Sequence, residues 1–211
     1  HFTIHSFPTR RSSDLATLEA PDYPWPIDQA LAADGERVFN RECKECHGRY
    51  GRGEHYPNKL VGLDEVGTDP AMAKAAVDDA EDYIRWFESS FYGRHSDAVP
   101  GRGYVAPPLD GVWATAPYLH NGAVPTIAAL LDTGKRPTYW RHDGADPDYD
   151  QAALGWQYRE LEQGREQFAS LEAQKWVYDT TRRGYGNQGH DFGDELSQGE
   201  RTAVLEYLKT L

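Results

Sequence analysis

The residues best suited to chemistry in this sequence are two cysteines and a histidine in a C-x-x-C-H pattern, Cys43, Cys46 and His47. Two thiols at this spacing can each form a thioether to one of the two vinyl groups of a porphyrin, and the adjacent histidine can then bind the iron. The pattern is therefore typical of one covalently attached haem c. Gly48 follows it and allows the backbone to pass close to a porphyrin edge.

Two other chemistries use similar cysteine spacing. A thioredoxin-like redox dithiol would need a strand before the motif and a helix that starts at it, whereas here a predicted helix precedes and a loop follows. A structural zinc site would need two further cysteine or histidine ligands near by. Haem attachment is thus the favoured interpretation of the motif. A binding or redox-dithiol domain without haem is kept as the alternative.

The other face of an iron held by His47 would be taken by a methionine or a second histidine. Met72 lies in an alanine-rich helical stretch, where methionine is most often a core filler. Three histidines have no feature that favours ligation: His55 is close to the motif, His95 precedes a loop rich in Gly and Pro, and His142 lies in a polar loop.

His120 and His190 are the stronger candidates. The side chain of His120, in a turn-ending loop, would face the cofactor or bond to the backbone. His190 lies in the glycine-rich loop 184–193, and such a chain can approach a porphyrin plane closely. Asp191 or a nearby carbonyl would orient its ring. From the residues alone, a plain surface position for His190 is an equally good interpretation.

The elements that must position these residues are mostly helical. Asp28 is a predicted N-cap for a helix to about residue 41, and a second helix is predicted from about 70 to 91. A short helix is expected after Pro125, a weaker one over 152–170, and a last one after the capping box that starts at Ser197. Loops this long are uncommon without something to hold them. We therefore expect a mostly α, cytochrome c-type haem domain with long loops and a helical insertion.

Composition narrows the function classes. The chain has 211 residues, with 22 Lys and Arg against 34 Asp and Glu, a formal net charge of −12. This charge argues against nucleic acid as a partner. No stretch approaches the roughly 20 apolar residues of a membrane span, and two cysteines exclude a disulfide-rich scaffold.

The N-terminal residues need separate treatment. Residues 5–15, HSFPTRRSSDL, resemble the translation of a common sequencing adapter. We expect residues 1–15 to be a non-native artefact and residues 16–211 to form a single c-type haem domain that is N-terminally truncated. A signal peptide would then be missing for that reason, and its absence says nothing about the compartment.

Residues 106–126, APPLDGVWATAPYLHNGAVPT, resemble the PYxHxG segment of bacterial di-haem cytochrome c peroxidases and their MauG-like relatives. The likeness is greatest to rubber-oxygenase-like members. Further matching segments precede and follow the C-x-x-C-H motif and include the GYGNQGHDFG loop and the closing LEYLKTL. Together they cover most of residues 24–211 in the same order.

This resemblance implies a cytochrome c fold around one haem, with a second haem domain upstream in the complete protein. In rubber-oxygenase-like members two histidines hold the C-terminal haem, which favours His47 and His190 as iron ligands and makes His120 a residue of the haem environment. The peroxidases use a methionine here, and this sequence has none after Met72. Relatives often carry Arg where this chain has Pro107, and no second C-x-x-C-H is present.

The favoured function is electron transfer, to or from a redox partner protein or the upstream haem domain of a di-haem peroxidase or oxygenase. An iron with both faces taken has no open site for substrate. The alternative is a peroxidase or oxygenase haem with one open face, where His120 moves a proton as acid or base. Haem attachment to cysteines occurs outside the bacterial cytoplasm, so we expect a periplasmic or secreted protein.

Overall fold

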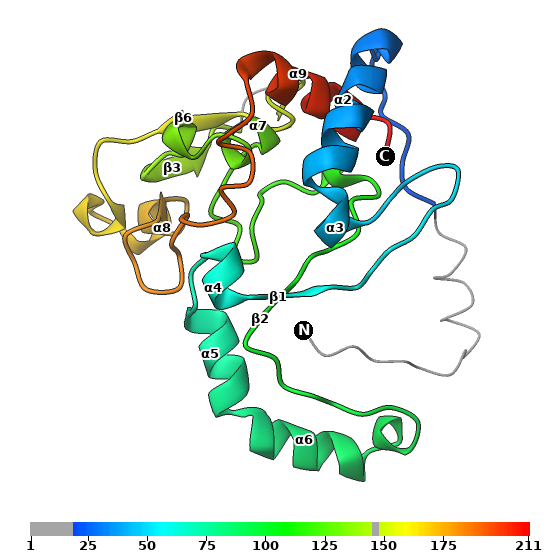
Figure 1. Cartoon of the computed structure of the whole chain (residues 1–211). Helices are drawn as coiled ribbons and strands as arrows, with labels where there is room; N and C mark the ends of the chain where they lie inside the picture. The colour runs from blue at the N-terminus through cyan, green and yellow to red at the C-terminus, as the bar shows by residue number, and fades with distance from the viewer. Residues whose placement is uncertain (1–18, 145–147) are drawn as a thin grey trace.

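The computed structural model describes residues 19–144 and 148–211 (Figure 1). The expected non-native segment, residues 1–15, lies outside the described residues. Helices make up 37% and strands 13% of the structure. The expectation of a mostly α fold is therefore wrong, because short strand pairs occupy segments that had been predicted as loop or helix.

The described elements are short apart from a few helices. The α-helices are α2 (Gln29–Glu42), α3 (Lys44–His47), α4 (Leu63–Val66), α5 (Ala71–Asp78), α6 (Ala80–Ser89), α7 (Ile127–Leu130), α8 (Leu171–Gln174) and α9 (Gln198–Leu208). The 3-10 helices are η1 (Tyr92–Arg94), η2 (Val112–Ala114), η3 (Thr133–Lys135) and η4 (Arg165–Gln167). The strands are β1 (Leu60–Gly62), β2 (Gly103–Val105), β3 (Tyr139–His142), β4 (Tyr149–Asp150), β5 (Gly155–Trp156), β6 (Tyr158–Glu160) and β7 (Tyr178–Asp179).

Helices α2 and α9 pack against each other at one end of the molecule (Figure 1). Their backbones meet at Gly35, where a β-carbon would lie 1.9 Å from the carbonyl oxygen of Ala203. Phe39 of α2 and Val204 of α9 are fully buried beside this contact. The pair forms much of the main core and fixes the end of α2 from which the C-x-x-C-H motif begins.

Both long helices start where their capping residues predict. The Asp28 carboxylate accepts hydrogen bonds from the backbone N–H groups of Ala30 and Leu31 in α2, and Ser197 and Glu200 form a reciprocal capping box at α9. The backbone N–H of Asp28 also donates to the buried carboxylate of Glu206, 2.6 Å away on α9. The two predicted helices are confirmed, and this bond ties the start of α2 to α9.

The strands form small antiparallel sheets: β1 with β2, β4 with β5, and a three-stranded sheet in the order β6-β3-β7. In the last sheet Trp140 is buried, stacks on Tyr178 with ring centroids 5.1 Å apart, and donates its indole N–H to the Ala123 carbonyl. The sheet thus packs against the segment that leads from His120 to α7.

The turn at residues 111–113 holds both ends of the described chain. The Gly111 N–H donates to the carbonyl of Leu211, and the Trp113 indole N–H donates to the carbonyl of Pro21, at 2.9 and 3.2 Å. Tyr23 lies edge-on against Trp113 with ring centroids 5.3 Å apart. One turn in the middle of the sequence therefore joins the lead-in before α2 to the end of the chain.

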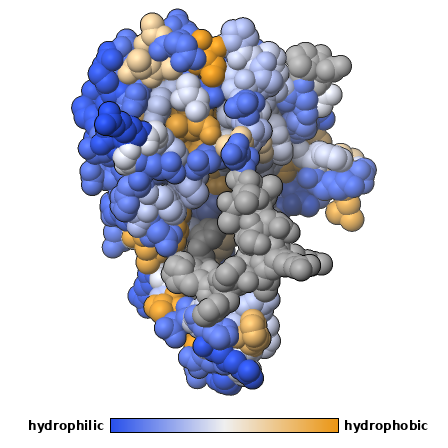
Figure 2. Space-filling view, turned by 90° about the vertical axis from the view of Figure 1, so that its right-hand side faces the viewer, coloured by the Kyte–Doolittle hydropathy of each residue, from blue (hydrophilic) through white to orange (hydrophobic). Residues whose placement is uncertain are grey.

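Helices α5 and α6 form an arm that extends away from the other elements (Figure 1). Asp79 ends α5 and α6 begins at the next residue, so the single helix expected over 70–91 is divided. Met72, which was expected to fill the core, is instead 55% exposed, and Trp86 of α6 is 59% exposed. The molecular face seen in Figure 2 is mostly hydrophilic, with small hydrophobic patches.

The weaker helix expected over 152–170 is wrong. Strands β5 and β6 lie in this segment instead, and Leu154, at 0% exposure, is part of the main core. The short helix after Pro125 is confirmed as α7, with Thr126 as its N-cap. Within the described residues, no helix combines the length and apolar character that crossing a bilayer requires.

Candidate functional site

The C-x-x-C-H motif lies where α2 ends. Cys43 is both the C-cap of α2 and the N-cap of α3. Helix α3 therefore places Cys46 and His47 one turn further along the chain. Gly48 ends α3 with a φ of +87°, and a β-carbon there would lie 2.4 Å from the His55 carbonyl oxygen. Glycine is needed at this position, because both the left-handed backbone and the close approach exclude larger residues.

Both cysteines are free thiols and half-buried, and they contact different apolar clusters. Cys43 packs against the main core, whereas Cys46 packs against a small cluster of Val61, Val66 and Ala106. Burial raises the pKa of Cys43 to about 12. Residues 19–42, the described part of the chain before the motif, contain no strand, so the local structure differs from that of a thioredoxin-like dithiol.

His47 has a fixed orientation. Its Nδ1 lies 2.9 Å from the carbonyl oxygen of Pro107, and as a donor there it leaves the lone pair of Nε2 free for a metal ion. Burial lowers the pKa of His47, which favours the neutral, metal-binding form. Pro107 makes this contact through its backbone carbonyl, a group that any residue at this position would supply.

His190 lies close to His47, with ring centroids 6.1 Å apart and ring planes inclined at 56°. Its backbone has a φ of +49°, and its N–H donates to the Val66 carbonyl at 2.6 Å. The ring Nδ1 is buried and has no hydrogen-bond partner among the described residues, so Asp191 does not orient the ring through that atom. Burial, and then the neighbouring His47, lower the pKa of His190 to about 4.

The loop that carries His190 is held through its backbone by residues that sequence reasoning missed. The buried Asp69 carboxylate accepts the N–H groups of Gly184 and Gly186, both at 3.1 Å. The Asn121 side-chain amide donates to the carbonyls of the same two glycines at 3.2 and 2.8 Å. No signal along the sequence links these residues, because Asp69 is more than 100 positions from the loop.

His120 stacks on Tyr104 of β2, with ring centroids 3.9 Å apart and planes inclined at 18°. Its Nε2 is buried and has no hydrogen-bond partner among the described residues. Burial lowers the pKa of His120, while the charge of Asp69 opposes the shift. In the described part of the chain, the ring contact of His120 is with Tyr104 rather than with His47 or His190.

The other candidates for iron ligation lie elsewhere. Met72 is exposed on the arm, and His142 lies on β3, 2.7 Å from the carboxylate of Asp148. His55 pairs with Arg49 in an isolated bridge. The ring of His95 lies against that of Phe91, and the other two, His1 and His5, fall outside the described residues.

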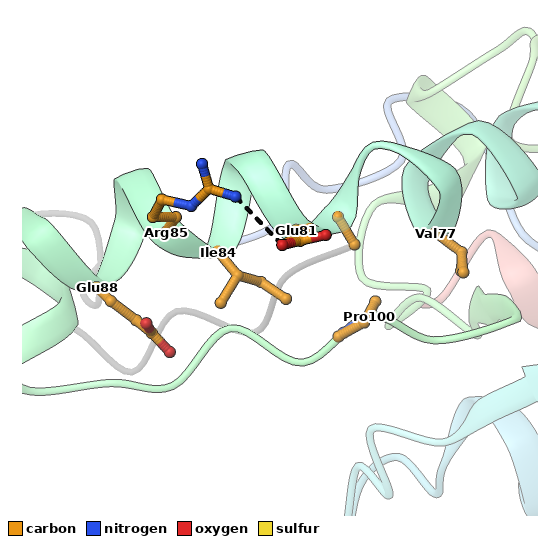
Figure 3. A pocket seen from close by; sticks show the side chains of 7 residues that line it. Val77, Glu81, Ile84, Arg85, Glu88 and Pro100 are labelled. Atoms are coloured by element: carbon orange, nitrogen blue, oxygen red, sulfur yellow. Dashed lines mark hydrogen bonds and ion pairs between the residues drawn. The ribbon is translucent and has the colours of Figure 1, made fainter.

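A pocket lies on the α5–α6 arm, where Val77, Ile84 and Pro100 line it beside an ion pair between Arg85 and Glu81 (Figure 3). It contains none of the candidate haem residues. Residues 19–144 and 148–211 include no group of three or more His, Cys, Asp or Glu side chains that could hold a metal ion.

The arrangement fits a haem iron. Imidazole nitrogens bind transition-metal ions at about 2.0–2.1 Å, so two imidazoles on opposite sides of one ion have ring centroids about 6 Å apart. The rings of His47 and His190 are 6.1 Å apart, and the cysteines that would carry the porphyrin precede His47. The residues present could therefore hold haem c.

Residues 103–141 match the family described as RoxA-like, cytochrome c-like. The match includes Tyr104, Pro107 and His120. Two proteins of Sinorhizobium fredii are similar to this chain, both with names that assign no function. Uncharacterized protein y4iJ is 29% identical over 256 residues, which cover 89% of this chain and 41% of that protein.

Uncharacterized protein y4iM is 30% identical over 204 residues, which cover 84% of this chain and 44% of that protein. The chain thus spans less than half the length of these curated relatives. The family match and the haem-attachment motif agree with each other, although they lie in different segments. The family match over residues 103–141 indicates a cytochrome c-like haem domain related to rubber oxygenase.

Proposed function

We propose that this chain is an electron-transfer domain that carries one haem c on Cys43 and Cys46, with His47 and His190 as the iron ligands. The observation that carries the proposal is the 6.1 Å separation of the two imidazole rings, which two ligands of a single iron would need. When bound, the haem supplies reversible one-electron chemistry. Neutral imidazoles on both faces leave no open position for a substrate, which favours electron exchange over catalysis.

The residues of this chain prepare the two ligands. The Pro107 carbonyl accepts the Nδ1 proton of His47 and so fixes its tautomer and its ring orientation. Val66 holds the backbone of His190, and Asp69 and Asn121 hold the preceding turn of the same loop. Ligands fixed in this way need little rearrangement when an electron arrives or leaves, and two histidines favour a lower potential than a histidine and a methionine.

The proposal extends to compartment and partner. Covalent haem attachment implies a periplasmic or secreted protein. The partner is a redox protein or an upstream haem domain of an oxidoreductase related to di-haem peroxidases and oxygenases. With a net charge of −12, the chain would attract a basic partner surface, and added salt should weaken that attraction.

Covalent attachment is tested by mass spectrometry of protein produced with a cytochrome c maturation system. The expected result is a mass increase of one haem on a peptide that contains Cys43 and Cys46. The variants Cys43→Ala and Cys46→Ala should each lose one thioether, whereas Lys44→Ala in the same motif should keep both. Bare thiols in the matured protein would overturn the proposal.

The ligand assignment is tested with His190→Ala. The wild-type oxidised protein should be low-spin and insensitive to cyanide, and His190→Ala should become high-spin and regain the low-spin spectrum when imidazole is added. His142→Ala, a half-buried histidine on β3, is the matched control and should keep the wild-type spectrum. A low-spin spectrum in His190→Ala would exclude His190 as the ligand.

A second candidate function is a peroxidase or oxygenase site with an open iron face. The observation in its favour is His120, whose buried Nε2 has no partner among the described residues and could move a proton. In that case the wild-type protein should be high-spin and react rapidly with peroxide. His120→Ala should then slow the reaction, and His190→Ala should change little.

A further inference from the structure

We propose that Arg136 is the positioning residue that holds the His190 loop in place, so that the imidazole of His190 stays on the iron. This inference rests on the proposed function. Arg136 is half-buried directly after η3 and donates five hydrogen bonds to backbone carbonyls of the described residues. None of these bonds goes to a haem-attachment cysteine or to His47, so its role is indirect.

The guanidinium of Arg136 donates to three carbonyls in four consecutive positions of the loop. Its two terminal nitrogens lie 2.5 Å from the Asn187 oxygen, 2.6 Å from that of Gly189 and 3.0 Å from that of His190. Two more bonds, to the carbonyls of Ala129 and Leu130 at 3.1 and 2.9 Å, anchor the same group to α7. The loop is thereby bound to a helix of the main core.

This loop needs an external partner because its backbone is irregular. Gly189 and His190 both have positive φ values, +73° and +49°, so their carbonyls have no place in a regular ladder. A β-carbon at Gly189 would lie 2.2 Å from Gly67, which shows how closely the loop passes the end of α4. The planar fork of arginine offers five donors in a fixed geometry, and no other side chain can serve these carbonyls together.

The charged group of Arg136 binds backbone carbonyls of the loop rather than the carboxylate of an ion pair. Among the described residues no carboxylate lies within ion-pair distance of its guanidinium, whereas Arg201 pairs with Asp132 at 3.0 Å. The cation is therefore bound directly by carbonyl dipoles, including that of His190, while the carboxylates of Asp194 and Asp191 act on it from a longer distance. Removing it would release the carbonyl of the ligand residue itself, while Asp69 and Asn121 hold only the earlier positions of the loop.

Arg201 provides the matched control. It also donates to two backbone carbonyls, that of Gly193 at the end of the loop and that of Asp194 directly after it, at 3.0 and 2.8 Å. It does not bond to residues 187–190. Arg201→Met should therefore lower stability without changing the haem spectrum, which separates a general loss of packing from a loss of ligand positioning.

The experiment compares haem-loaded wild type, Arg136→Met, Arg136→Lys and Arg201→Met. In Arg136→Met we expect a partly high-spin spectrum, binding of added imidazole that is about tenfold tighter or more, and about tenfold faster hydrogen exchange at the amide of His190. Lysine retains the charge but lacks the fork, so Arg136→Lys should show the same changes to a smaller degree. This variant also keeps the test decisive if Arg136→Met does not fold.

Each result decides a different point. A low-spin wild type with unchanged imidazole binding in both Arg136 variants would overturn the role of Arg136 and leave the proposed function intact. Equal changes in Arg136→Met and Arg201→Met would also overturn it. A wild type without a low-spin signal would overturn the proposed function, and this inference with it.

Discussion

Gly35 of α2 lies against Ala203 of α9 so closely that a β-carbon at position 35 would be only 1.9 Å from the Ala203 carbonyl oxygen. The two helices are the first and last of the described chain, and the C-x-x-C-H motif begins where α2 ends. The distance between the two helices therefore affects both the stability of the core and the position of the haem-attachment residues.

Gly35→Ala should destabilise the protein by about 1–3 kcal/mol, because the added methyl group forces the helices apart. An exposed glycine in a helix would show the opposite sign, since alanine has the higher helix propensity. The measurement is urea unfolding of the haem-loaded protein. Glu36→Ala, an exposed neighbour on α2, is the control and should change the free energy of unfolding by about 0.5 kcal/mol or less. A stabilised Gly35→Ala variant would contradict the close contact.

Asp69→Ala should loosen the first half of the His190 loop. The carboxylate accepts the N–H groups of Gly184 and Gly186 as well as that of Ala71, and a buried charged acceptor of this kind contributes about 1.5–3 kcal/mol. Hydrogen exchange should become faster at the two glycine amides. Asp64→Ala, an exposed carboxylate on α4, should leave their exchange unchanged.

Tyr104→Phe keeps the ring that stacks on His120 and removes only the hydroxyl. That hydroxyl donates to the Asp69 carbonyl at 2.8 Å and accepts the Ala73 N–H at 3.2 Å. We expect a loss of about 1 kcal/mol in the free energy of unfolding, with the environment of His120 preserved in its NMR chemical shifts. Tyr104→Leu removes the stack too, and should shift the His120 signals. Unchanged signals in Tyr104→Leu would argue against the stack.

The capping box of α9 predicts a specific pH dependence. The backbone N–H of Ser197, then the Arg41 guanidinium and the Ser197 hydroxyl, lower the pKa of Glu200 to about 2 from an ordinary value of 4.5. A depressed pKa means that the stabilisation is complete above about pH 4.5 and is lost as the pH falls towards 2. Glu200→Gln should reduce the slope of stability against pH in that window.

The control for this experiment is Glu195→Gln, which removes one exposed carboxylate near the same end of α9 and leaves the contacts of Glu200 in place. Its stability profile over the same pH range should follow that of the wild type more closely. Identical profiles for wild type and Glu200→Gln would show that the capping box makes no measurable contribution. The comparison is made by urea unfolding at fixed ionic strength, because Arg41 contributes through an exposed ion pair.

The two long helices were predictable because their signals are local. Asp28 and Ser197 cap the helices through atoms within three residues, and apolar residues repeat at helical spacing behind them. The strands gave no comparable signal. They are two to four residues long, too short for an alternation of polar and apolar residues to show, and their pairing depends on distant segments.

The residues of the candidate site fall into the same two groups, those with a local signal in the sequence and those without one. Cys43, Cys46 and His47 could be found because their chemistry requires adjacent positions in the sequence. His190 was proposed from its glycine-rich loop and a family resemblance, whereas the residues that hold this loop were missed. Arg136 is 54 positions from His190, and its five acceptors are backbone carbonyls, which have no side-chain signature in the sequence.

The turn at residues 111–113 has a consequence for the topology of the protein. Since Pro21 and Leu211 both bond to it, the two ends of the described chain are neighbours, and the path of the backbone is nearly a closed ring. A short linker could join them, with new termini opened in an exposed loop such as the one at Gly51 and Gly53. Such a circular permutant should retain the helix pair, since the connection would bridge residues that are already held together.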